Sequence, residues 1–390
     1  MAILKVDTIS GIGTEGPVFE GDIEFTSQNF LTLPKGDTTQ RISTSSGIST
    51  ETGAVRYNTD SNKMECYIGS TWMEGAVSSP NLDGGARAIF SAGRTASGSP
   101  QNTMDYITIS SQGNAIDFGD STDNYEAQNV GACASNTRGM NAGGYSNPAH
   151  KNDIGFTEIA STGNHADFGD LTVTRRAIES ASSQTRGLFC MGLIVGTYYN
   201  TIDYVTIAST GNAVDFGDAT VTGASGGGMS SPTRGVFTAG DPSASAAAMF
   251  VTIASLGNAQ DFGDDFSPNN RYGASTISNQ TRGFVGGGVH PSPTTIVSYV
   301  SKFELASLGN ATRYADLSTT TRSKNGAGSP TRGVFAGGRS PADSDSSPSG
   351  PQNTIDYVSM QTEGNAVDFG DLTQARYEHA PMGNAHGGLG

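Results

Sequence analysis

Acidic residues and arginines recur through the sequence at a spacing that could support ion pairing or metal binding. The motif D-F-G-D, or a variant, occurs six times, and its second Asp is present in every copy. An Arg in a T-R-G motif (A-R-A in the first copy) recurs in step with it, at intervals of 48 to 51 residues. A guanidinium fits a carboxylate, so this pattern predicts six structural Arg–Asp pairs, or Asp-to-turn hydrogen bonds, partly buried between strands. The predicted members are Arg87, Arg138, Arg186, Arg234, Arg282, Arg332, Asp120, Asp170, Asp218, Asp264, Asp316 and Asp371.

The first Asp of the motif is replaced by Arg313 in the fifth copy, which predicts an exposed position. Its other members are Asp117, Asp167, Asp215, Asp261 and Asp368. Two carboxylates separated by a glycine supply few of the oxygen ligands that calcium needs. We therefore favour a structural role over a metal site and expect no cofactor, with calcium at an Asp site as the open alternative.

No group of residues has the spacing of a catalytic site. The five histidines, His150, His165, His290, His379 and His386, are scattered, and the motifs G-x-S-x-G, H-E-x-x-H and C-x-x-C are absent. The acids recur once per unit, as scaffold residues do, whereas a catalytic site should be asymmetric. The sequence predicts a protein that is not an enzyme, with a glycan-cleaving activity as a minor alternative.

Composition excludes several classes of partner. Charged residues make up 15% of the 390 residues, the formal net charge is −15, and no Lys/Arg cluster is visible, which argues against nucleic-acid binding. Cys66, Cys133 and Cys190 are too few and too widely spaced to indicate a disulfide framework or a zinc site. The most apolar run, residues 188–196, is too short to span a bilayer. We expect no membrane insertion, and folding or assembly in a reducing cytoplasm.

The repeat predicts the fold. Each unit of about 50 residues contains an apolar run closed by Gly, a D-Y strand, a T-G-N hairpin turn, the D-F-G-D strand and a variable stretch such as 172–183. Four strands per unit predict an all-β, six-bladed, kelch-like β-propeller of four-stranded blades over residues 81–390. The repeats start near residues 86, 136, 184, 232, 280 and 330, and the end of the chain is expected to supply the last outer strand. A linear β-solenoid is the main competing fold.

The copies diverge most in the link between the apolar run and the D-Y strand. Binding sites on repeat proteins lie where the copies differ, so these links are expected on one face. Aromatic rings with polar tips suit sugars or protein epitopes. The predicted binding residues are Tyr145, His150, Tyr198, Tyr199 and His290, and solvated turns with incidental aromatic residues are the alternative.

Residues 1–80 lack the repeat. The stretch 53–75 predicts a small β-rich module with few large apolar residues, among them Val55, Tyr57 and Trp72. So small an apolar content gives limited stability to an isolated module. We expect it to pack on identical copies or on a larger assembly.

Two stretches also carry a resemblance. "LPKGDTTQR" followed by "GAVRYNTDSNKMECYIGSTW" resembles a module of tail-fibre and other virion structural proteins of tailed bacteriophages. The repeats "IDYVTIASTGNAVDFGDL" and "SSPTRGVFAGG" resemble kelch-like propeller arrays of cyanophage-type phages.

The resemblance implies a virion component, often trimeric, with a propeller displayed outward. We expect a tail-fibre or tail-tip adhesin that is assembled in the host cytoplasm and located in the virion tail. Residues 1–80 would attach it to other virion proteins as a homotrimer or other homo-oligomer, while the repeats bind a host-surface glycan or protein. A passive part of the baseplate, neck or capsid decoration is the alternative.

Overall fold

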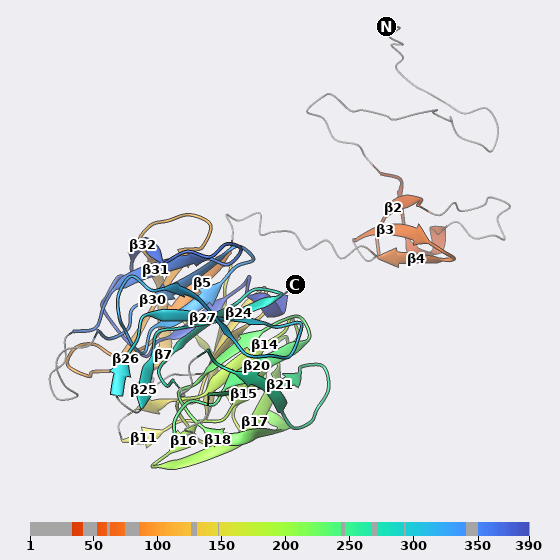
Figure 1. Ribbon diagram of the computed structural model, residues 1–390. Helices are drawn as coiled ribbons and strands as arrows, with labels where there is room; N and C mark the ends of the chain where they lie inside the picture. Colours follow the sequence, from red (N-terminus) through yellow and green to blue (C-terminus); the bar gives the residue numbers. More distant parts are fainter. Residues whose placement is uncertain are drawn as a thin grey trace, which may run out of the picture. The chain divides into compact units, whose positions relative to one another are not determined.

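The protein is built from β-strands. The computed structural model describes residues 33–41, 53–60, 63–74, 86–125, 131–146, 148–242, 246–266, 271–291, 294–340 and 350–389 (Figure 1). The chain divides into a unit of residues 1–80 and a unit of residues 81–390. Over the described ranges there are two short 3-10 helices and no α-helix, so the predicted all-β class is confirmed. None of the described helices has the length and apolarity needed to cross a membrane.

The N-terminal unit contains one small sheet. Its strands, in spatial order, are β1 (Lys35–Gly36), β2 (Val55–Asn58), β3 (Lys63–Ile68) and β4 (Thr71–Glu74), with the 3-10 helix η1 (Thr38–Gln40) after β1. The buried carboxylate of Glu65 accepts hydrogen bonds from Asn58 Nδ2 at 2.8 Å and from Arg41 Nε at 3.1 Å, and it is 3.6 Å from Arg56 Nε. A polar cluster therefore holds one face of this sheet together.

The second unit contains six antiparallel sheets of the same design. Sheet 1 consists of β33 (Ala380–Gly383), β5 (Arg87–Ser91), β6 (Gln101–Thr108) and β7 (Ile116–Tyr125). Sheet 2 consists of β8 (Gly131–Ala134), β9 (Arg138–Ala142), β12 (Asp153–Glu158) and β13 (Ala166–Asp170). Sheet 3 consists of β14 (Glu179–Ser182), β15 (Arg186–Cys190), β17 (Thr197–Thr206) and β18 (Val214–Gly223), with β16 (Leu193–Ile194) paired to β17.

The remaining sheets repeat this order. Sheet 4 consists of β19 (Gly227–Ser230), β20 (Arg234–Thr238), β21 (Ala247–Thr252) and β22 (Gln260–Asp264). Sheet 5 consists of β23 (Ser275–Ser278), β24 (Arg282–Gly286), β27 (Tyr299–Glu304) and β28 (Thr312–Asp316). Sheet 6 consists of β29 (Asn325–Gly328), β30 (Arg332–Ala336), β31 (Thr354–Ser359) and β32 (Val367–Asp371). Two hairpins, β10 (Tyr145–Ser146) with β11 (Ala149–His150) and β25 (Val289–Pro291) with β26 (Thr294–Ile296), lie in the links of sheets 2 and 5.

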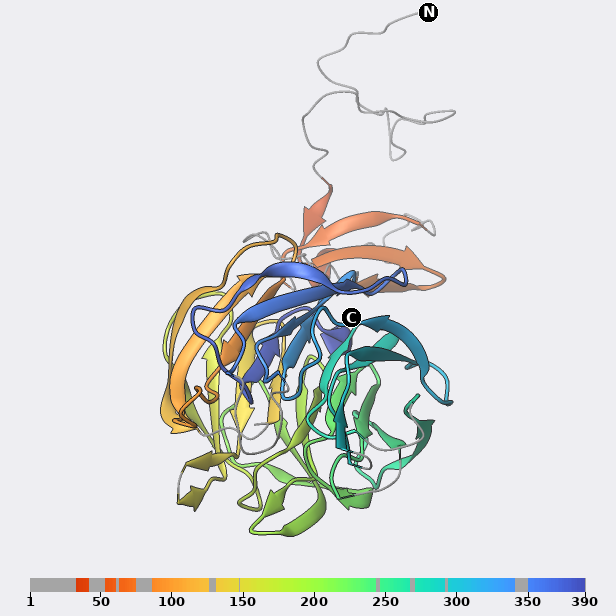
Figure 2. The same ribbon diagram turned by 60° about the vertical axis from the view of Figure 1, so that its left-hand side comes forward.

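The last strand of the chain completes the first sheet. Strand β33 pairs with β5, so sheet 1 joins residues 380–383 to residues 87–125. The first strands of the sheets, β8, β14, β19, β23, β29 and β33, contact one another in that order, and β33 also contacts β8. Figure 2 shows the sheets of this unit following one another in sequence order, from orange through green to blue. The expectation that the chain end adds an outer strand is therefore wrong: it adds the strand that lies among the first strands of the other sheets.

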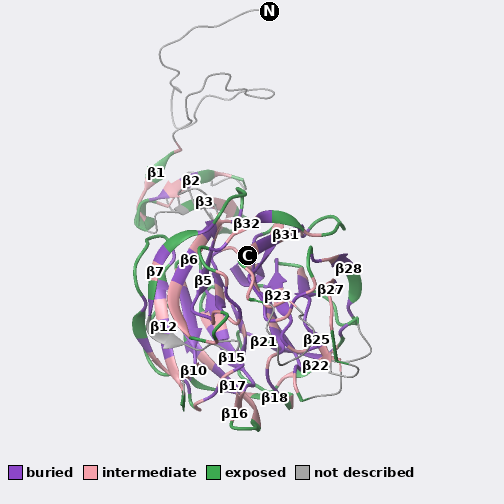
Figure 3. Ribbon diagram, turned by 90° about the vertical axis from the view of Figure 1, so that its left-hand side faces the viewer, coloured by how far each residue is buried: buried purple, intermediate pink, exposed green. Residues whose placement is uncertain are grey.

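The recurring D-F-G sequence forms a β-bulge. In sheet 3, Ile202 pairs with Gly217 and Asp203 pairs with Asp215, which leaves Phe216 without an opposite residue. The ring of Phe216 packs edge-on against Tyr204, with 5.9 Å between the centroids. The same edge-on pair recurs in other sheets, as Tyr106–Phe118, Phe156–Phe168, Phe250–Phe262 and Tyr357–Phe369. The motif is thus an aromatic anchor for the apolar layers between sheets. Figure 3 shows that buried residues recur along the strands of this unit.

A seam of backbone contacts joins each fourth strand to the G-N turn of the next sheet. In sheets 3 and 4, Gly257 N–H donates to Phe216 O at 2.9 Å, and Asp218 N–H donates to Asn258 Oδ1 at 3.0 Å. A Cβ on Gly217, whose φ is +145°, would lie 2.6 Å from the backbone of Gly257. Only glycine allows this approach.

The seam has six copies, the last of which joins sheet 6 to sheet 1. The Asp-to-Asn bonds are Asp120–Asn164, Asp170–Asn212, Asp218–Asn258, Asp264–Asn310, Asp316–Asn365 and Asp371–Asn114. The fifth copy has Ala315 in place of the glycine. There, unlike in the other described copies, the Gly364 N–H makes no hydrogen bond to Tyr314 O, as expected when a methyl group occupies the contact.

The repeated arginines form a second link between sheets, and the predicted pairing with the repeated Asp is wrong. Arg234 Nη1 donates to Leu305 O of the next sheet at 3.0 Å, while its guanidinium lies 5.0 Å from the ring of Phe250. Equivalent bonds to carbonyls of the next sheet are made by Arg87, Arg138, Arg186, Arg282 and Arg332. Among the described residues no ion pair joins these arginines to a repeated Asp, because a carbonyl of the neighbouring sheet takes the place predicted for the carboxylate.

The repeated Asp residues contribute through their backbone. Asp120, Asp218 and Asp264 are exposed, and Asp170, Asp316 and Asp371 are half-buried. Within the part of the chain that the structure describes, only Asp316 among them has an ion pair, to Arg313 on the same strand. The prediction that the first Asp of the motif is exposed is confirmed for Asp117, Asp167, Asp215, Asp261 and Asp368.

The seam predicts that Gly217→Ala destabilises the protein. The added methyl would overlap the Gly257 backbone, so we expect a loss of about 1–3 kcal/mol in the free energy of unfolding, measured in urea. Gly163→Ala is the matched control, since a Cβ there meets no atom within 4 Å. Equal stability of the two variants would contradict a seam that requires glycine.

The arginine link predicts unequal effects at two repeat positions. Arg234→Ala removes a charged hydrogen bond and the contact with Phe250, so we expect a loss of about 1–3 kcal/mol and a lower Tm. Asp264→Ala removes an exposed carboxylate and should change stability by less than about 0.5 kcal/mol. Comparable losses in calorimetry would instead favour the paired Arg–Asp arrangement.

Candidate functional site

The residues that differ between copies lie at one end of the sheets. In each sheet the start of the first strand pairs with the end of the second strand, as Glu179 pairs with Cys190 in sheet 3. The divergent link begins directly after that second strand, so it lies at the same end of the sheet. We call this end of the six sheets the variable end. Successive sheets are joined there by backbone hydrogen bonds, Ser225 N to Ala177 O, Gly273 N to Ser225 O, Ser323 N to Gly273 O and Glu378 N to Ser323 O.

The structure places the five predicted binding residues in links at the variable end but not in one cluster. Tyr145 and His150 lie opposite each other in the β10–β11 hairpin, with ring centroids 4.9 Å apart. Tyr198 donates to Asp241 Oδ2 at 2.5 Å, and this hydrogen bond raises its pKa to about 12. Tyr199 pairs through its backbone with Gly223 of β18.

One arginine connects three of these residues. Arg176 lies 5.2 Å from the ring of Tyr145, and its charge acts on both His150 and Tyr198. Burial, together with Arg176, lowers the pKa of His150. His290 is separate, because its Nε2 is 2.8 Å from the hydroxyl of Tyr299 within sheet 5.

A ring of equivalent backbone bridges lies beneath the links, and its residues do not repeat. The bridges are Arg94–Tyr377, Arg176–Leu193, Ala224–Asp241, Tyr272–Val289 and Arg322–Arg339. Arginines therefore occupy this ring in sheets 1, 3 and 6, whereas sheets 4 and 5 have other residues. These positions therefore differ between sheets, whereas a scaffold position would hold the same residue type in each.

The charges of four arginines in this ring act on one carboxyl. Glu378 has a φ of +59° and a side chain that is 15% exposed, and its Oε2 lies 3.6 Å from Arg94 Nε. The charges of Arg94, Arg176, Arg322 and Arg339 all act on it. We call these four residues the arginine cluster. Burial raises the pKa of Glu378 to about 7 in spite of the arginines, so near neutral pH this carboxyl is only partly ionised.

The arginine cluster has almost no signal in the sequence. Its members are 94, 176, 322 and 339, two of them in the divergent links and two in the stretches before the first strands. The only signal in the sequence is that Arg339 and Arg94 follow the Gly of the apolar run, where the other copies have Tyr, Leu, Asp or Val. That signal does not say which residues from distant copies meet.

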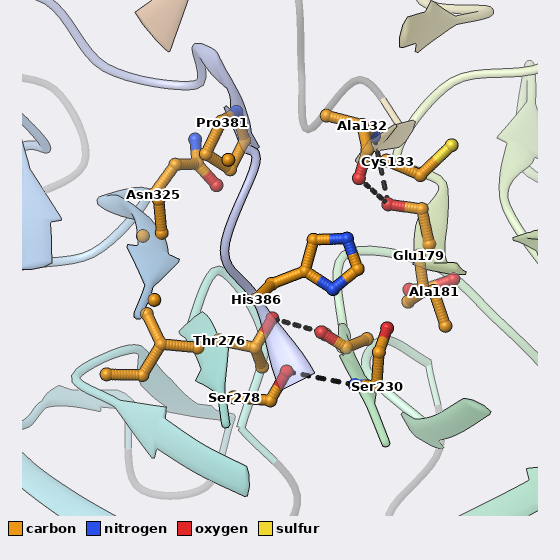
Figure 4. A pocket seen from close by; sticks show the side chains of 18 of the residues that line it. Ala132, Cys133, Glu179, Ala181, Ser230, Thr276, Ser278, Asn325, Pro381 and His386 are labelled. Carbon is orange, nitrogen blue, oxygen red and sulfur yellow. Dashed lines mark hydrogen bonds between the residues drawn. The ribbon is translucent and has the colours of Figure 1, made fainter. Parts of the chain in front are cut away.

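A small cavity lies between the first strands of all six sheets. It has a volume of about 100 Å³ and is lined by Ser180, Thr276, Asn325, Pro381 and His386, among others (Figure 4). Glu179 also lines it; its Oε1 accepts from Gly226 N–H at 2.6 Å, and burial raises its pKa to about 8. Glu179 is therefore largely protonated at neutral pH, and it contributes little charge.

The C-terminal segment closes the cavity at the end opposite the variable end. His386 Nε2 is 2.8 Å from Ala134 O and 3.1 Å from Ser182 Oγ, and its Nδ1 accepts from Gly388 N–H at 3.1 Å. Burial lowers the pKa of His386 to about 4, so the ring is neutral and Nε2 carries the proton. The 3-10 helix η3 (Gly387–Leu389) passes so near β14 that a Cβ on Gly388 would lie 1.7 Å from Ser182 O.

Buried ion pairs elsewhere in the sheets are part of the scaffold. Arg175–Asp203 and Arg376–Asp105 are each 3.0 Å apart with both side chains fully buried. Lys324–Asp356, at 2.6 Å, occupies the corresponding place in sheet 6. Desolvation makes such pairs costly to break, so they fix strand positions rather than offer charge to a ligand. In these three buried pairs the carboxylate belongs to the D-Y strand and not to D-F-G-D.

The described part of sheet 2 has no buried ion pair at this position of the D-Y strand. Gly155 stands where sheets 1, 3 and 6 have the buried Asp, and His165 stands where the other sheets have Ala. A Cβ on Gly155 would be 3.2 Å from His165 Nδ1, so the imidazole occupies the space that the missing side chain leaves. Both ring nitrogens lack hydrogen-bond partners among the described residues, and burial lowers the pKa of His165 to about 4.

The chemistry available at the variable end is recognition by charge and by aromatic rings. Within the part of the chain that the structure describes, no group of three or more His, Cys, Asp or Glu side chains could hold a metal ion. Comparison of the sequence with known protein families and with curated proteins found no match. The function is therefore inferred from the sequence and from the geometry given above.

The buried imidazole predicts a pH-dependent difference between the protein and its His165→Ala variant. Its pKa is lowered in the folded state, so the unfolded state binds the extra proton, and stability falls as the pH drops from about 6.5 towards 4. Relative to His165→Ala, the unchanged protein should lose up to about 3 kcal/mol across this window. Urea unfolding at pH 7.5 and pH 4.5 measures the difference, and a constant difference would contradict the neutral buried histidine.

Proposed function

We propose that the six sheets of residues 81–390 are the blades of a six-bladed, kelch-like β-propeller. The strand pairing of β33 with β5 supports this arrangement, because it connects the end of the repeat region to its beginning. The seams support it as well: Arg332 Nη1 of sheet 6 donates to Ser110 O of sheet 1 at 3.0 Å, and Gly113 N–H donates to Phe369 O at 3.0 Å. Terminal units of a linear solenoid would have no such contacts, which favours the propeller over the solenoid.

We propose further that this protein is a virion structural protein of a tailed bacteriophage, a tail-fibre or tail-tip adhesin. The observation that carries the proposal is the division of the repeat into two kinds of position. The Asp-to-Asn bond of the seam recurs in all six sheets, whereas the variable end differs from copy to copy and holds tyrosines, histidines and the arginine cluster. A constant scaffold that presents one diversified surface is suited to recognising a host-surface glycan or protein.

The N-terminal unit is suited to attachment. Val55, Met64, Ile68 and Met73 lie on the same face of its sheet, and between 39% and 57% of each is exposed. The opposite face holds the polar cluster around Glu65. An exposed apolar face of this kind supports burial against identical copies or other virion proteins, consistent with a homotrimer or another homo-oligomer in the virion tail.

A passive structural part in the baseplate, neck or capsid decoration is the second candidate. The exposed apolar face of the N-terminal unit favours it equally, because that face could serve assembly alone. The variable end separates the two candidates, since a passive part would use it to bind virion proteins and an adhesin would use it to bind host cells. Glycan cleavage is a weaker candidate, tested by release of reducing sugar from host envelope.

The adhesin proposal predicts that the full-length chain binds host cells and that Tyr198→Ala with Tyr199→Ala weakens this binding. The loss follows because Tyr198 ties the link of sheet 3 to Asp241 of sheet 4. Flow cytometry with labelled protein measures binding, and the Tm of the double variant should stay close to that of the parent.

Val214→Thr, at an exposed position on β18, is the control and should bind as the parent does. Immunogold labelling of virions provides the second readout, with label at the tail tip expected. Label at the neck or head, together with no binding to host cells, would exclude the adhesin in favour of the passive part.

A further inference from the structure

The arginine cluster places like charges together where the fold does not need them. Arg322 and Arg339 lie directly opposite each other and exchange both backbone hydrogen bonds, Arg322 N–H to Arg339 O at 3.0 Å and Arg339 N–H to Arg322 O at 2.8 Å. Directly opposite residues of an antiparallel pair project to the same side, and like charges there are destabilising. The equivalent pairs Ala224–Asp241 and Tyr272–Val289 occupy the same backbone positions without two cations.

The cluster extends from this pair across neighbouring sheets. Arg94 of sheet 1 exchanges backbone hydrogen bonds with Tyr377, the residue before Glu378, and Arg339 lies 5.7 Å from the ring of Tyr377. Arg176 acts on the same carboxyl from sheet 3. The partly ionised carboxyl of Glu378 therefore receives the charges of four guanidinium groups from three sheets.

Guanidinium groups whose charges act on one carboxyl are suited to binding an oxyanion. Arg presents its N–H donors in a planar fork that matches the oxygens of carboxylate, sulfate or phosphate. The half-buried setting strengthens these bonds relative to those in bulk water. In the described structure Glu378 supplies the oxyanion from within the chain.

We infer that the arginine cluster binds an oxyanion group, a carboxylate or a sulfate, of an acidic host-surface polysaccharide. This inference rests on the proposed role in host recognition and names the class of ligand. The half-buried ring of Tyr145, beside Arg176 of the cluster, supplies a flat apolar surface of the kind that sugar rings pack on. The formal net charge of −15 opposes general attraction of polyanions, so binding should depend on this local cluster.

Dextran and its charged derivatives share one polysaccharide backbone and differ in their charged groups, so they serve as matched probes. Titration calorimetry of the full-length chain is expected to show tighter binding of carboxymethyl-dextran or dextran sulfate than of dextran. The preference for one derivative identifies carboxylate or sulfate as the group recognised. Binding should weaken as sodium chloride rises from about 50 to about 200 mM.

Variants of the cluster test the site itself. Arg339→Gln and, independently, Arg94→Gln should each weaken binding of the preferred derivative at least about tenfold, the effect of losing one charged hydrogen bond. Arg313→Gln is the matched control, because Arg313 is 53% exposed on β28 and belongs to the repeated outer strands. It makes the same change of charge and should leave binding unchanged. Two arginine positions are used so that a fold defect in one variant still leaves a second measurement.

Several outcomes would overturn the inference. Equal binding of dextran and both derivatives, or parental binding by both cluster variants, excludes an oxyanion site in the arginine cluster. An equal loss in Arg313→Gln indicates general ion exchange, and equally tight binding of poly-glutamate excludes specificity for polysaccharide. If both cluster variants bind host cells as strongly as the parent, the inference fails while the adhesin proposal stands. If the parent binds no host cells, the adhesin proposal fails, and with it the assignment of a host polysaccharide.

Discussion

The contact on which the rest of the structure depends is the close approach of two backbones at the Gly of D-F-G-D. At this point the fourth strand of one sheet lies so near the G-N turn of the next that no Cβ fits in the described copies that keep the glycine. The adjacent bulge turns a Phe or Tyr into the apolar layer, and the Asn side chain closes the seam by accepting from a backbone N–H. Repetition of this one contact lets six small sheets, each with little interior of its own, cover one another's faces.

Because the seam joins each sheet to the next, the constant scaffold and the variable surface are separated in space. The Arg of the second strand bonds to the next sheet, and the Asp of the D-Y strand is neutralised inside its own sheet, so both kinds of charge are fixed. The variable end lies beyond these contacts. Its links can therefore change in length and chemistry without disturbing the seam. Each link has its own combination of residues, and tyrosines, histidines and arginines occur in some links and not in others.

The distribution of charge also differs between the scaffold and the variable end. The protein carries a net negative charge spread over exposed carboxylates of the outer strands, while the four arginines around Glu378 form a local exception. The cavity between the first strands is close to neutral, since Glu179 is largely protonated and His386 is uncharged, and the C-terminal segment closes one of its ends. A ligand that uses charge would therefore meet the protein at the variable end rather than inside the cavity.

The sequence by itself determined the number of units, the type of their strands, the turns between them and the end at which they differ, because local spacing and turn chemistry decide these features. The joint recurrence of G-N and D-F-G-D also indicated which residues form the seam. The recurrence alone did not predict that the Asn side chain accepts a hydrogen bond there. Only the tertiary structure decided the partners. Arg234 bonds to a carbonyl 71 residues away instead of to an Asp, and the charges of Arg94 and Arg339, which are far apart in the sequence, both act on Glu378. Which polar groups contact each other depends on the distance between sheets. The sequence pattern of one unit gives no information on that distance.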